Sequence, residues 1–215
     1  MKKYKLIVFD FDGTLADTAE CIVQTTKATL RKLGLKERTE AEIRNVIGLP
    51  LGQCFSTMFP DGTKELFDKC CDVYRELFYS YQETTIRLFP EVKETLRRLV
   101  DDGVKVSIAT SRGSQSLGYL CQMLQIDDCV GMKMSADLVA EAKPAPDMVN
   151  KILEHYGISP ADTLVVGDTI YDIEMGQRAD CDTCGVTYGN QTRQQLQEQK
   201  PTYIIDNFGD LLRHV

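Results

Sequence analysis

The chain has 215 residues, of which 43% are hydrophobic and 27% are charged, so it can bury a sizeable core and is not expected to be disordered. Its formal net charge of −7 argues against a nucleic-acid-binding surface, which requires clustered Lys and Arg side chains. No apolar run approaches the length of about 18 residues needed to cross a membrane. We therefore expect neither nucleic acid nor a membrane as a partner.

The eight cysteines are interpreted as reduced thiols. The N-terminus shows no charged and then apolar signal segment, so a cytoplasmic protein is expected. Cys181 and Cys184 have the spacing of a metal or redox motif, but they lie in an apolar, strand-like run without a second pair of Cys or His. We predict that these two thiols pack in the core.

The first predicted strand, residues 5–9, ends on two acidic residues, Asp10 and Asp12. Because side chains alternate along an extended chain, both carboxylates can project to one side while Phe11 turns away. Such a pair attracts a hard cation such as Mg²⁺, and a carboxylate beside magnesium suits phosphoryl transfer. Gly13 allows a tight turn, and Thr14 offers a hydroxyl and an amide there. An acidic strand exit without chemical function is the alternative interpretation.

The next part of the chain has helical periodicity and no predicted strand. Helices are predicted over residues 17–32, 39–46, 51–59 and 64–84. Asp17 is expected to cap the first helix, Gly34 to follow its end, and Thr39 with Glu42 to form a capping box for the second. We predict an all-helical cap domain over residues 16–83, inserted into a core domain formed by residues 1–15 and 84–215.

From residue 89 onward, predicted helices and strands alternate. The helices cover residues 92–100, 115–124, 147–155 and 170–178, and the strands cover residues 104–109, 130–134, 163–167 and 183–188. This alternation is typical of parallel strands with covering helices. The predicted fold class is α/β, with a Rossmann-like parallel sheet covered by helices on both faces. Ligands of such sheets bind at the carboxyl ends of the strands.

Polar residues follow three further segments at this edge. Thr110, Ser111 and Arg112 follow one strand, Lys143 lies in a Pro-rich turn before a helix, and Asp168 and Asp172 follow another strand. Each motif alone also fits a helix cap or a solvated surface residue. Their succession along the chain is difficult to explain by turn chemistry.

These motifs together resemble those of the haloacid dehalogenase superfamily, in the branch of phosphoglycolate phosphatase and beta-phosphoglucomutase with a helical cap. The Asp10-Phe-Asp-Gly-Thr14 segment matches the first motif of the superfamily, and Thr110 matches the second. Lys143 in the Lys-Pro-Ala-Pro-Asp segment and Gly167-Asp-Thr-Ile-Tyr-Asp172 match the others. The resemblance covers nearly the whole chain.

The resemblance implies an aspartyl-phosphate mechanism. Asp10 would attack phosphorus, and Asp12 would act as general acid and then general base. Mg²⁺ would be held by Asp10, the backbone carbonyl of Asp12 and Asp168, with Asp172 supporting this set of ligands. Groups that would stabilise the phosphoryl oxygens are Lys143, the Thr110 hydroxyl, and the amides of Ser111 and Gly13.

A magnesium-dependent phosphatase acting on a small phosphomonoester is therefore the expected function. Asp12 favours phosphate esters over the dehalogenase and phosphonate-cleaving branches, and the absence of a His after residues 17–20 disfavours a mutase. A mutase, a pyrophosphatase, a receiver-like phosphoacceptor and a scaffold remain as alternatives.

Specificity is expected to depend on the cap and on residues facing Asp10. Arg44, Leu49 and Arg112 are the candidates, together with Gly13, Thr14 and Ser111 for binding the phosphate. The expected partner is a small phosphorylated metabolite, and the expected state is a monomer or weak dimer.

Overall fold

A parallel six-stranded sheet forms the centre of the core, with β1 (Leu6–Phe9) near its middle. The computed structural model describes residues 4–215, with the side chains of residues 81–84 excepted. The strand order is β5-β4-β1-β6-β7-β8, and all adjacent pairs are parallel. The other strands are β4 (Lys105–Thr110), β5 (Met132–Ser135), β6 (Thr163–Gly167), β7 (Asp182–Val186) and β8 (Tyr203–Ile205). The predicted α/β class is confirmed.

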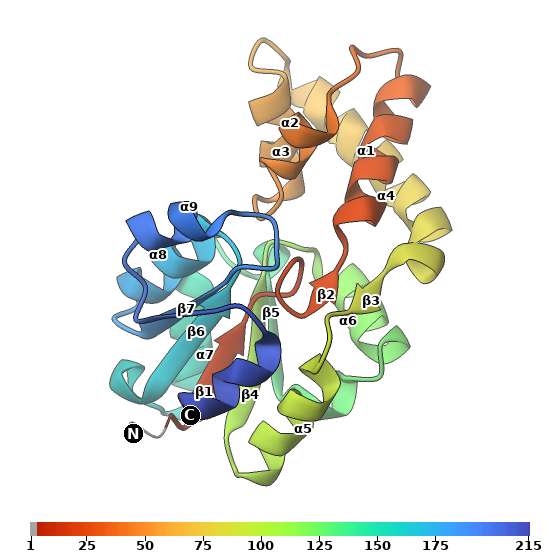
Figure 1. The fold of residues 1–215 in the computed structure, drawn as a ribbon. Coiled ribbons are helices and arrows are strands. Elements are labelled where there is room, and N and C mark those ends of the chain that lie inside the picture. The colour runs from red at the N-terminus through yellow and green to blue at the C-terminus, as the bar shows by residue number, and fades with distance from the viewer. Residues whose placement is uncertain (1–3) are drawn as a thin grey trace.

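Both faces of the sheet are apolar, because successive residues of β1 alternate between two buried clusters. Ile7 and Phe9 belong to the larger cluster, and Leu6 and Val8 belong to the smaller one. The larger cluster packs beneath α5 (Val92–Asp101) and α6 (Ser114–Met123), and the smaller beneath α7 (Asp147–Tyr156) and α8 (Ile170–Arg178). Helices therefore cover both faces, as expected (Figure 1).

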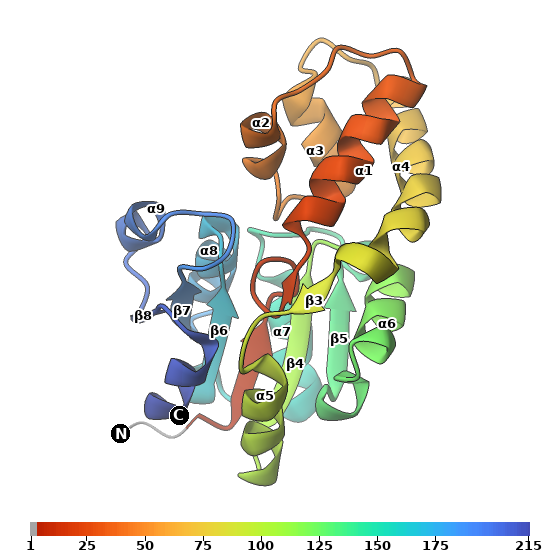
Figure 2. The ribbon, with the colours of Figure 1, turned by 45° about the vertical axis from the view of Figure 1, so that its right-hand side comes forward.

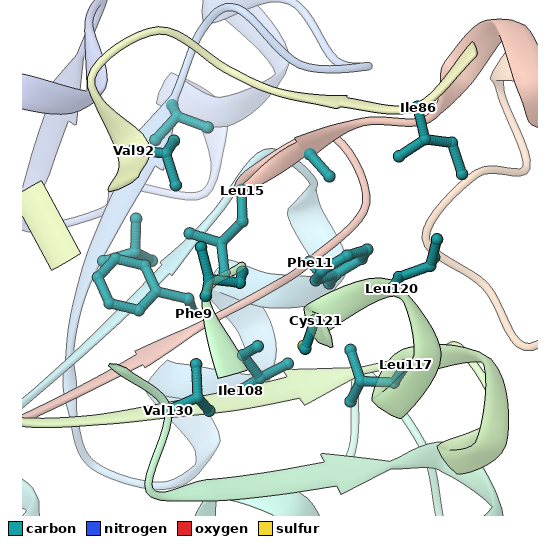
Figure 3. Packing of buried hydrophobic residues seen from close by; sticks show 14 of the residues in the cluster. Phe9, Phe11, Leu15, Ile86, Val92, Ile108, Leu117, Leu120, Cys121 and Val130 are labelled. Atoms are coloured by element: carbon teal, nitrogen blue, oxygen red, sulfur yellow. The ribbon is translucent and has the colours of Figure 1, made fainter. Parts of the chain in front are cut away.

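Phe11 lies among the apolar residues of the larger cluster and is fully buried. Figure 3 shows its ring near Leu120 and Cys121 of α6, with Phe9 and Val92 further along the same cluster. Phe11 therefore packs into the core between the two acidic residues, Asp10 and Asp12.

A unit of four helices stands beyond the carboxyl ends of the strands (Figures 1 and 2). We call it the helical unit; it consists of α1 (Ala19–Lys32), α2 (Glu40–Arg44), α3 (Leu51–Met58) and α4 (Lys64–Thr85). The predicted capping box is present, since the Thr39 side chain accepts from the Glu42 amide and Glu42 accepts from the Thr39 amide. The helix predicted over residues 39–46 is shorter than expected, because the chain turns after Arg44.

Two short strands connect the core to the helical unit. β2 (Ala16–Asp17) and β3 (Arg87–Leu88) pair in antiparallel fashion, with Asp17 opposite Arg87. The prediction that Asp17 caps the first helix is therefore wrong: Thr18 is at the N-cap, and Asp17 belongs to the ribbon. The helix α4 also continues to Thr85, past the predicted domain boundary at residue 83.

The C-terminal part adds elements that the sequence pattern did not predict. These are β8 and a 3-10 segment, Phe208–Arg213, whose Phe208 packs on Phe9 with ring centroids 5.5 Å apart. The Gln-rich segment forms α9 (Arg193–Glu198), with a capping box at Thr192. Cys181 and Cys184 are buried, and all eight cysteines are free thiols. Within residues 4–215, no helix has the length and apolar character to cross a membrane.

Candidate active site

The carboxyl ends of β4, β1 and β6, which are neighbours in the sheet, place the predicted residues close together. Asp10 and Asp12 directly follow β1, Thr110 ends β4, and Asp168 follows β6. Parallel strands bring their carboxyl ends to one edge, which is why residues more than 150 positions apart meet here. Asp10 and Thr110 are 4% and 1% exposed, and Asp168 is fully buried.

Asp168 is held by three donors. The Thr14 hydroxyl donates to its Oδ1 at 3.1 Å, and the amide and side chain of Asn190 donate to its Oδ2 at 2.7 and 2.8 Å. Gly13 passes directly over this carboxylate with φ of +91°, and an added Cβ would lie 2.3 Å from Asp168 Oδ2. Only glycine fits this backbone position without displacing the carboxylate.

Lys143 joins two of the carboxylates. Its Nζ donates to Asp10 Oδ1 and, at 2.6 Å, to Asp172 Oδ1, and its side chain has no exposed surface. The other oxygen of Asp172 accepts from the amide and hydroxyl of Thr169, at 2.9 and 2.7 Å. The Lys143 ammonium is thus fixed beside Asp10. There it can attract a negatively charged group of a substrate that approaches the Asp10 carboxylate.

The buried charges at this edge are unbalanced. One oxygen from each of Asp10, Asp168 and Asp172 lies within 4.8 Å of the others, and Lys143 is the cation that bonds to two of them. Burial, followed by the proximity of Asp172, raises the pKa of Asp168 to about 7. Burial also raises the pKa of Asp10, although Lys143 opposes this shift.

This donor set fits a divalent cation. Three buried carboxylates against one ammonium leave excess negative charge in a poorly solvated place, and hard cations such as Mg²⁺ prefer oxygen ligands. Asp10 and Asp168 are the candidate ligands, because Lys143 bonds to one oxygen of Asp10 and the donors to Asp168 are uncharged. Asp172 instead uses one oxygen for Lys143 and the other for Thr169. The Asp12 carboxylate is not part of this cluster. Asp12 therefore remains a candidate ligand through its backbone carbonyl and not through its side chain.

Asp12 instead forms a forked ion pair with Arg112. The Arg112 Nε donates to Asp12 Oδ2 at 3.0 Å and its Nη2 donates to Oδ1, while Nη1 donates to Ser116. The guanidinium lies 4.7 Å from the ring centroid of Phe78 in α4. Burial lowers the pKa of Arg112, but Asp12 outweighs this effect and raises it, so the guanidinium stays charged. Arg112 thereby fixes the orientation of the Asp12 carboxylate.

A cavity of about 530 Å³ lies between this edge of the sheet and the helical unit. Asp10, Asp12, Thr110 and Ser111 line its floor, and Leu49 lines the opposite wall. The Ser111 hydroxyl donates to the carbonyl of Gly48 at 2.6 Å, which ties the loop after β4 to the loop between α2 and α3. The cavity is therefore bounded on both sides by parts of the chain that contact each other.

Three predicted substrate-binding residues are placed differently from expectation. The Thr14 hydroxyl bonds to Asp168, so it is not directed at a substrate. Arg44 pairs with Glu40 at 2.8 Å and does not line the cavity. Arg112 does line the cavity, but its guanidinium is paired with Asp12.

Asn190 is the site residue that the sequence analysis missed. It follows β7 in a Tyr188-Gly-Asn190 segment, a polar strand end of the same kind as those considered. Tyr188 donates its hydroxyl to the Thr14 carbonyl at 3.0 Å, and an added Cβ at Gly189 would lie 2.3 Å from Asp168 Cβ. The rule of strand ends, applied to β7, would have found this segment.

The family model described as haloacid dehalogenase-like hydrolase matches residues 7–186, which include every residue of the cluster. The chain belongs to this family. The predicted resemblance is confirmed, and with it the prediction of an enzyme of the hydrolase class. Family membership also excludes the receiver-like alternative.

Curated relatives have phosphatase names. The chain is 30% identical to a protein named pyrophosphatase PpaX from Bacillus cereus over 206 residues, which cover 96% of this chain and 94% of the relative. It is 28% identical to a phosphoglycolate phosphatase from Vibrio vulnificus over 218 residues, which cover 98% of this chain and 96% of the relative.

Solved structures of the same fold are also similar. A haloacid dehalogenase-like hydrolase from Bacteroides fragilis is 26% identical, with a TM-score of 0.92, and the match covers 97% of this chain and 100% of that one. A structure described as a predicted phosphoglycolate phosphatase from Haemophilus somnus is also 26% identical, with a TM-score of 0.89, and the match covers 100% of this chain and 99% of that one.

Proposed function

We propose that the protein is a magnesium-dependent phosphatase that hydrolyses a small phosphomonoester through an aspartyl-phosphate on Asp10. The observation that carries the proposal is the buried cluster of Asp10, Asp168 and Asp172 with Lys143, open to a cavity lined by Asp10 and Asp12. The phosphatase names of the relatives support the same class of reaction.

Asp10 is the proposed nucleophile, because it is the one carboxylate of this cluster that lines the cavity. Its lone pair attacks phosphorus, and the bond from phosphorus to the ester oxygen breaks. Lys143, fixed next to Asp10, stabilises the charge that develops on the phosphoryl oxygens, and Thr110 donates to one of them. A bound Mg²⁺ would supply further neutralisation of this charge and orient Asp10.

Asp12 is the proposed general acid and base. Its carboxyl group lines the cavity beside Asp10, and Arg112 fixes its orientation. In its protonated form it gives a proton to the leaving oxygen, and the carboxylate that results takes a proton from the attacking water. The water then releases phosphate from Asp10 and regenerates the free carboxylate.

A pyrophosphatase is the second candidate, because relatives 30% identical to this chain carry that name. The mutase alternative gains no support from the cavity, since Cys21 and Ile22 occupy the start of α1 where a His was sought.

The test is phosphate release by the purified protein with Mg²⁺ from a panel of phosphoglycolate, a sugar phosphate, pyrophosphate and an aryl phosphate. Asp10→Asn is expected to fall below about 1% of wild-type kcat, because losing the nucleophile costs several kcal/mol of barrier. Asp162→Asn is the control, since Asp162 pairs with Lys5 near the amino end of β1. Phosphate release by Asp10→Asn at the wild-type rate would contradict the proposal.

A further inference from the structure

The wall that the helical unit contributes to the cavity is almost entirely uncharged. Its members come from all four helices and from the loop between α2 and α3. They are Ile22, Thr26, Ile43, Val46, Ile47, Gly48, Leu49, Pro50, Leu51, Gly52, Cys54, Phe55, Met58, Tyr74, Arg75, Phe78 and Tyr79. Arg75 is the one charged side chain in this set, so the wall is suited to an apolar group.

The cations around the cavity already have carboxylate partners. Arg75 is 63% exposed and pairs with Asp72 on the outer surface of α4. Arg112 pairs with Asp12, and Lys143 pairs with Asp10 and Asp172. Within the part of the chain that the structure describes, each of these cations lies beside a carboxylate, so a second anionic group of a substrate would have to compete with that partner. Asp137, which also lines the cavity, would repel such a group.

Three aromatic rings form the inner part of this wall. Tyr74 packs edge-on against Phe55, with centroids 6.3 Å apart, and stacks on Phe78 at 5.8 Å. The Tyr74 hydroxyl donates to no residue that the structure describes. Burial raises the pKa of Tyr74; Arg112 opposes this shift and Asp12 adds to it, so both lie close enough to act on the hydroxyl. The rings thus present an apolar surface with one uncharged hydrogen-bonding group near the reacting carboxylates.

The volume of the cavity is large for the leaving groups suggested by the names of the relatives. A volume of about 530 Å³ lies in the range of roughly 300–1,000 Å³ typical of pockets for drug-sized ligands. Glycolate has two carbons, and pyrophosphate has no apolar surface, so either would leave the aromatic wall in contact with water. An alcohol with a ring or a branched chain would cover it.

We propose that the substrate is a phosphomonoester whose alcohol part is uncharged, largely apolar and larger than glycolate. The phosphate lies at Asp10, and the alcohol part lies against Phe55, Tyr74 and Phe78. This inference rests on the proposed phosphatase function and specifies its substrate class. A carboxylate or second phosphate on the alcohol part is disfavoured, because burying a charge against the apolar wall is costly.

Two probes with one difference test the charge requirement. Benzyl phosphate and 4-carboxybenzyl phosphate share the reacting bond and the ring, and differ by one remote carboxylate. We expect kcat/KM for benzyl phosphate to exceed that for 4-carboxybenzyl phosphate, phosphoglycolate and pyrophosphate by about tenfold or more, because burying an unpaired charge is costly. Equal or higher kcat/KM for any of the three anionic probes overturns the inference.

A matched pair of variants locates the effect in this wall. Leu49→Lys places a cation in the half-buried loop that lines the cavity, whereas Gln53→Lys places one on the exposed side of α3. Leu49→Lys is expected to raise the ratio of kcat/KM for 4-carboxybenzyl to benzyl phosphate by about tenfold, and Gln53→Lys to leave it unchanged. An unchanged ratio in both variants contradicts the placement of the alcohol part.

The two proposals fail in different ways. If the wild-type protein with Mg²⁺ releases phosphate neither from these four probes nor from the sugar phosphate and aryl phosphate of the panel, the proposed function fails. If it releases phosphate most efficiently from phosphoglycolate or pyrophosphate, the phosphatase function stands and the inference about the substrate class is wrong. Tyr74→Phe, which keeps the ring, is expected to retain the preference for benzyl phosphate.

Discussion

Asp168 combines complete burial with three hydrogen bonds, yet its pKa is raised to about 7. The donors Thr14 and Asn190 favour the ionised form, but burial and the neighbouring Asp172 outweigh them. A bound divalent cation would remove this conflict. The free energy of unfolding should therefore depend on both pH and metal through this one side chain.

The metal-free protein should become less stable as pH rises toward and through about 7. Between the ordinary Asp pKa of 3.8 and about 7, folded Asp168 holds a proton that the unfolded chain has released, so deprotonation disfavours the folded state. Mg²⁺ binds the ionised carboxylate, so it should raise Tm more at about pH 8 than at about pH 5.5. Thermal unfolding with chelator or with Mg²⁺ measures both effects.

Asp168→Asn should lose most of the Mg²⁺-dependent increase in Tm, because the amide cannot neutralise the cation. Asp162→Asn, which changes a carboxylate paired with exposed Lys5, should behave like the wild type. An increase in Tm of wild-type size in Asp168→Asn would mean that the cation binds elsewhere.

Strand ends predicted which residues belong to the site, but they did not predict which of these residues pair with each other. Asp10, Thr110 and Asp168 were predicted because apolar runs end at them, and the structure brings them together with Lys143. The pairing of Arg112 with Asp12 joins residues a hundred positions apart through the adjacency of β1 and β4. Sequence periodicity gives no strand order, so the partner of Arg112 could not be predicted.

At the scale of elements, long periodic segments were predicted well and short ones were not. The helices α1 and α7 and the strand β6 lie close to their predicted ranges. β2 and β3 have two residues each and contain no period that a sequence pattern can reveal. The prediction that Asp17 caps α1 was wrong for the same reason: the short strand β2 was not predicted, and its pairing with Arg87 keeps Asp17 extended.

A hydrogen bond from the Ser111 hydroxyl to the Gly48 carbonyl joins the loop after β4 to the loop after α2. Ser111→Ala removes this bond, which is worth about 1 kcal/mol, so the arrangement that encloses the cavity should be less populated. KM should rise up to about fivefold with little change in kcat. Steady-state kinetics on benzyl phosphate measures the change.

Ser114→Ala is the control for this element, because the Ser114 hydroxyl bonds to Asp137 at 2.7 Å and does not reach the helical unit. Its KM should match the wild type. Backbone hydrogen exchange at Gly48 should become faster in Ser111→Ala alone. If KM and exchange are both unchanged in Ser111→Ala, this bond does not hold the two loops together.

At the scale of the molecule, one apolar cluster extends from the sheet into the helical unit. It contains Phe9 and Ile108 of the sheet as well as Phe55 and Tyr74 of the helices. The connection between the two parts runs through the β2–β3 ribbon, where Asp17 lies opposite Arg87. We propose that the helical unit is a separate cap domain that excludes water from Asp10 when substrate is bound.

The ribbon provides the place to test this proposal. A variant in which a short Gly/Ser turn joins Asp17 directly to Arg87 keeps the site at the sheet edge and removes the aromatic wall. If the sheet is an independent domain, this variant should fold, bind Mg²⁺ and hydrolyse a small aryl phosphate slowly. Its preference for benzyl over 4-carboxybenzyl phosphate should disappear, because the apolar wall that disfavours the carboxylate is gone.

Circular dichroism and kcat/KM on both probes measure these outcomes. An unfolded variant would contradict the independence of the two domains, and a retained preference would place specificity in the sheet domain.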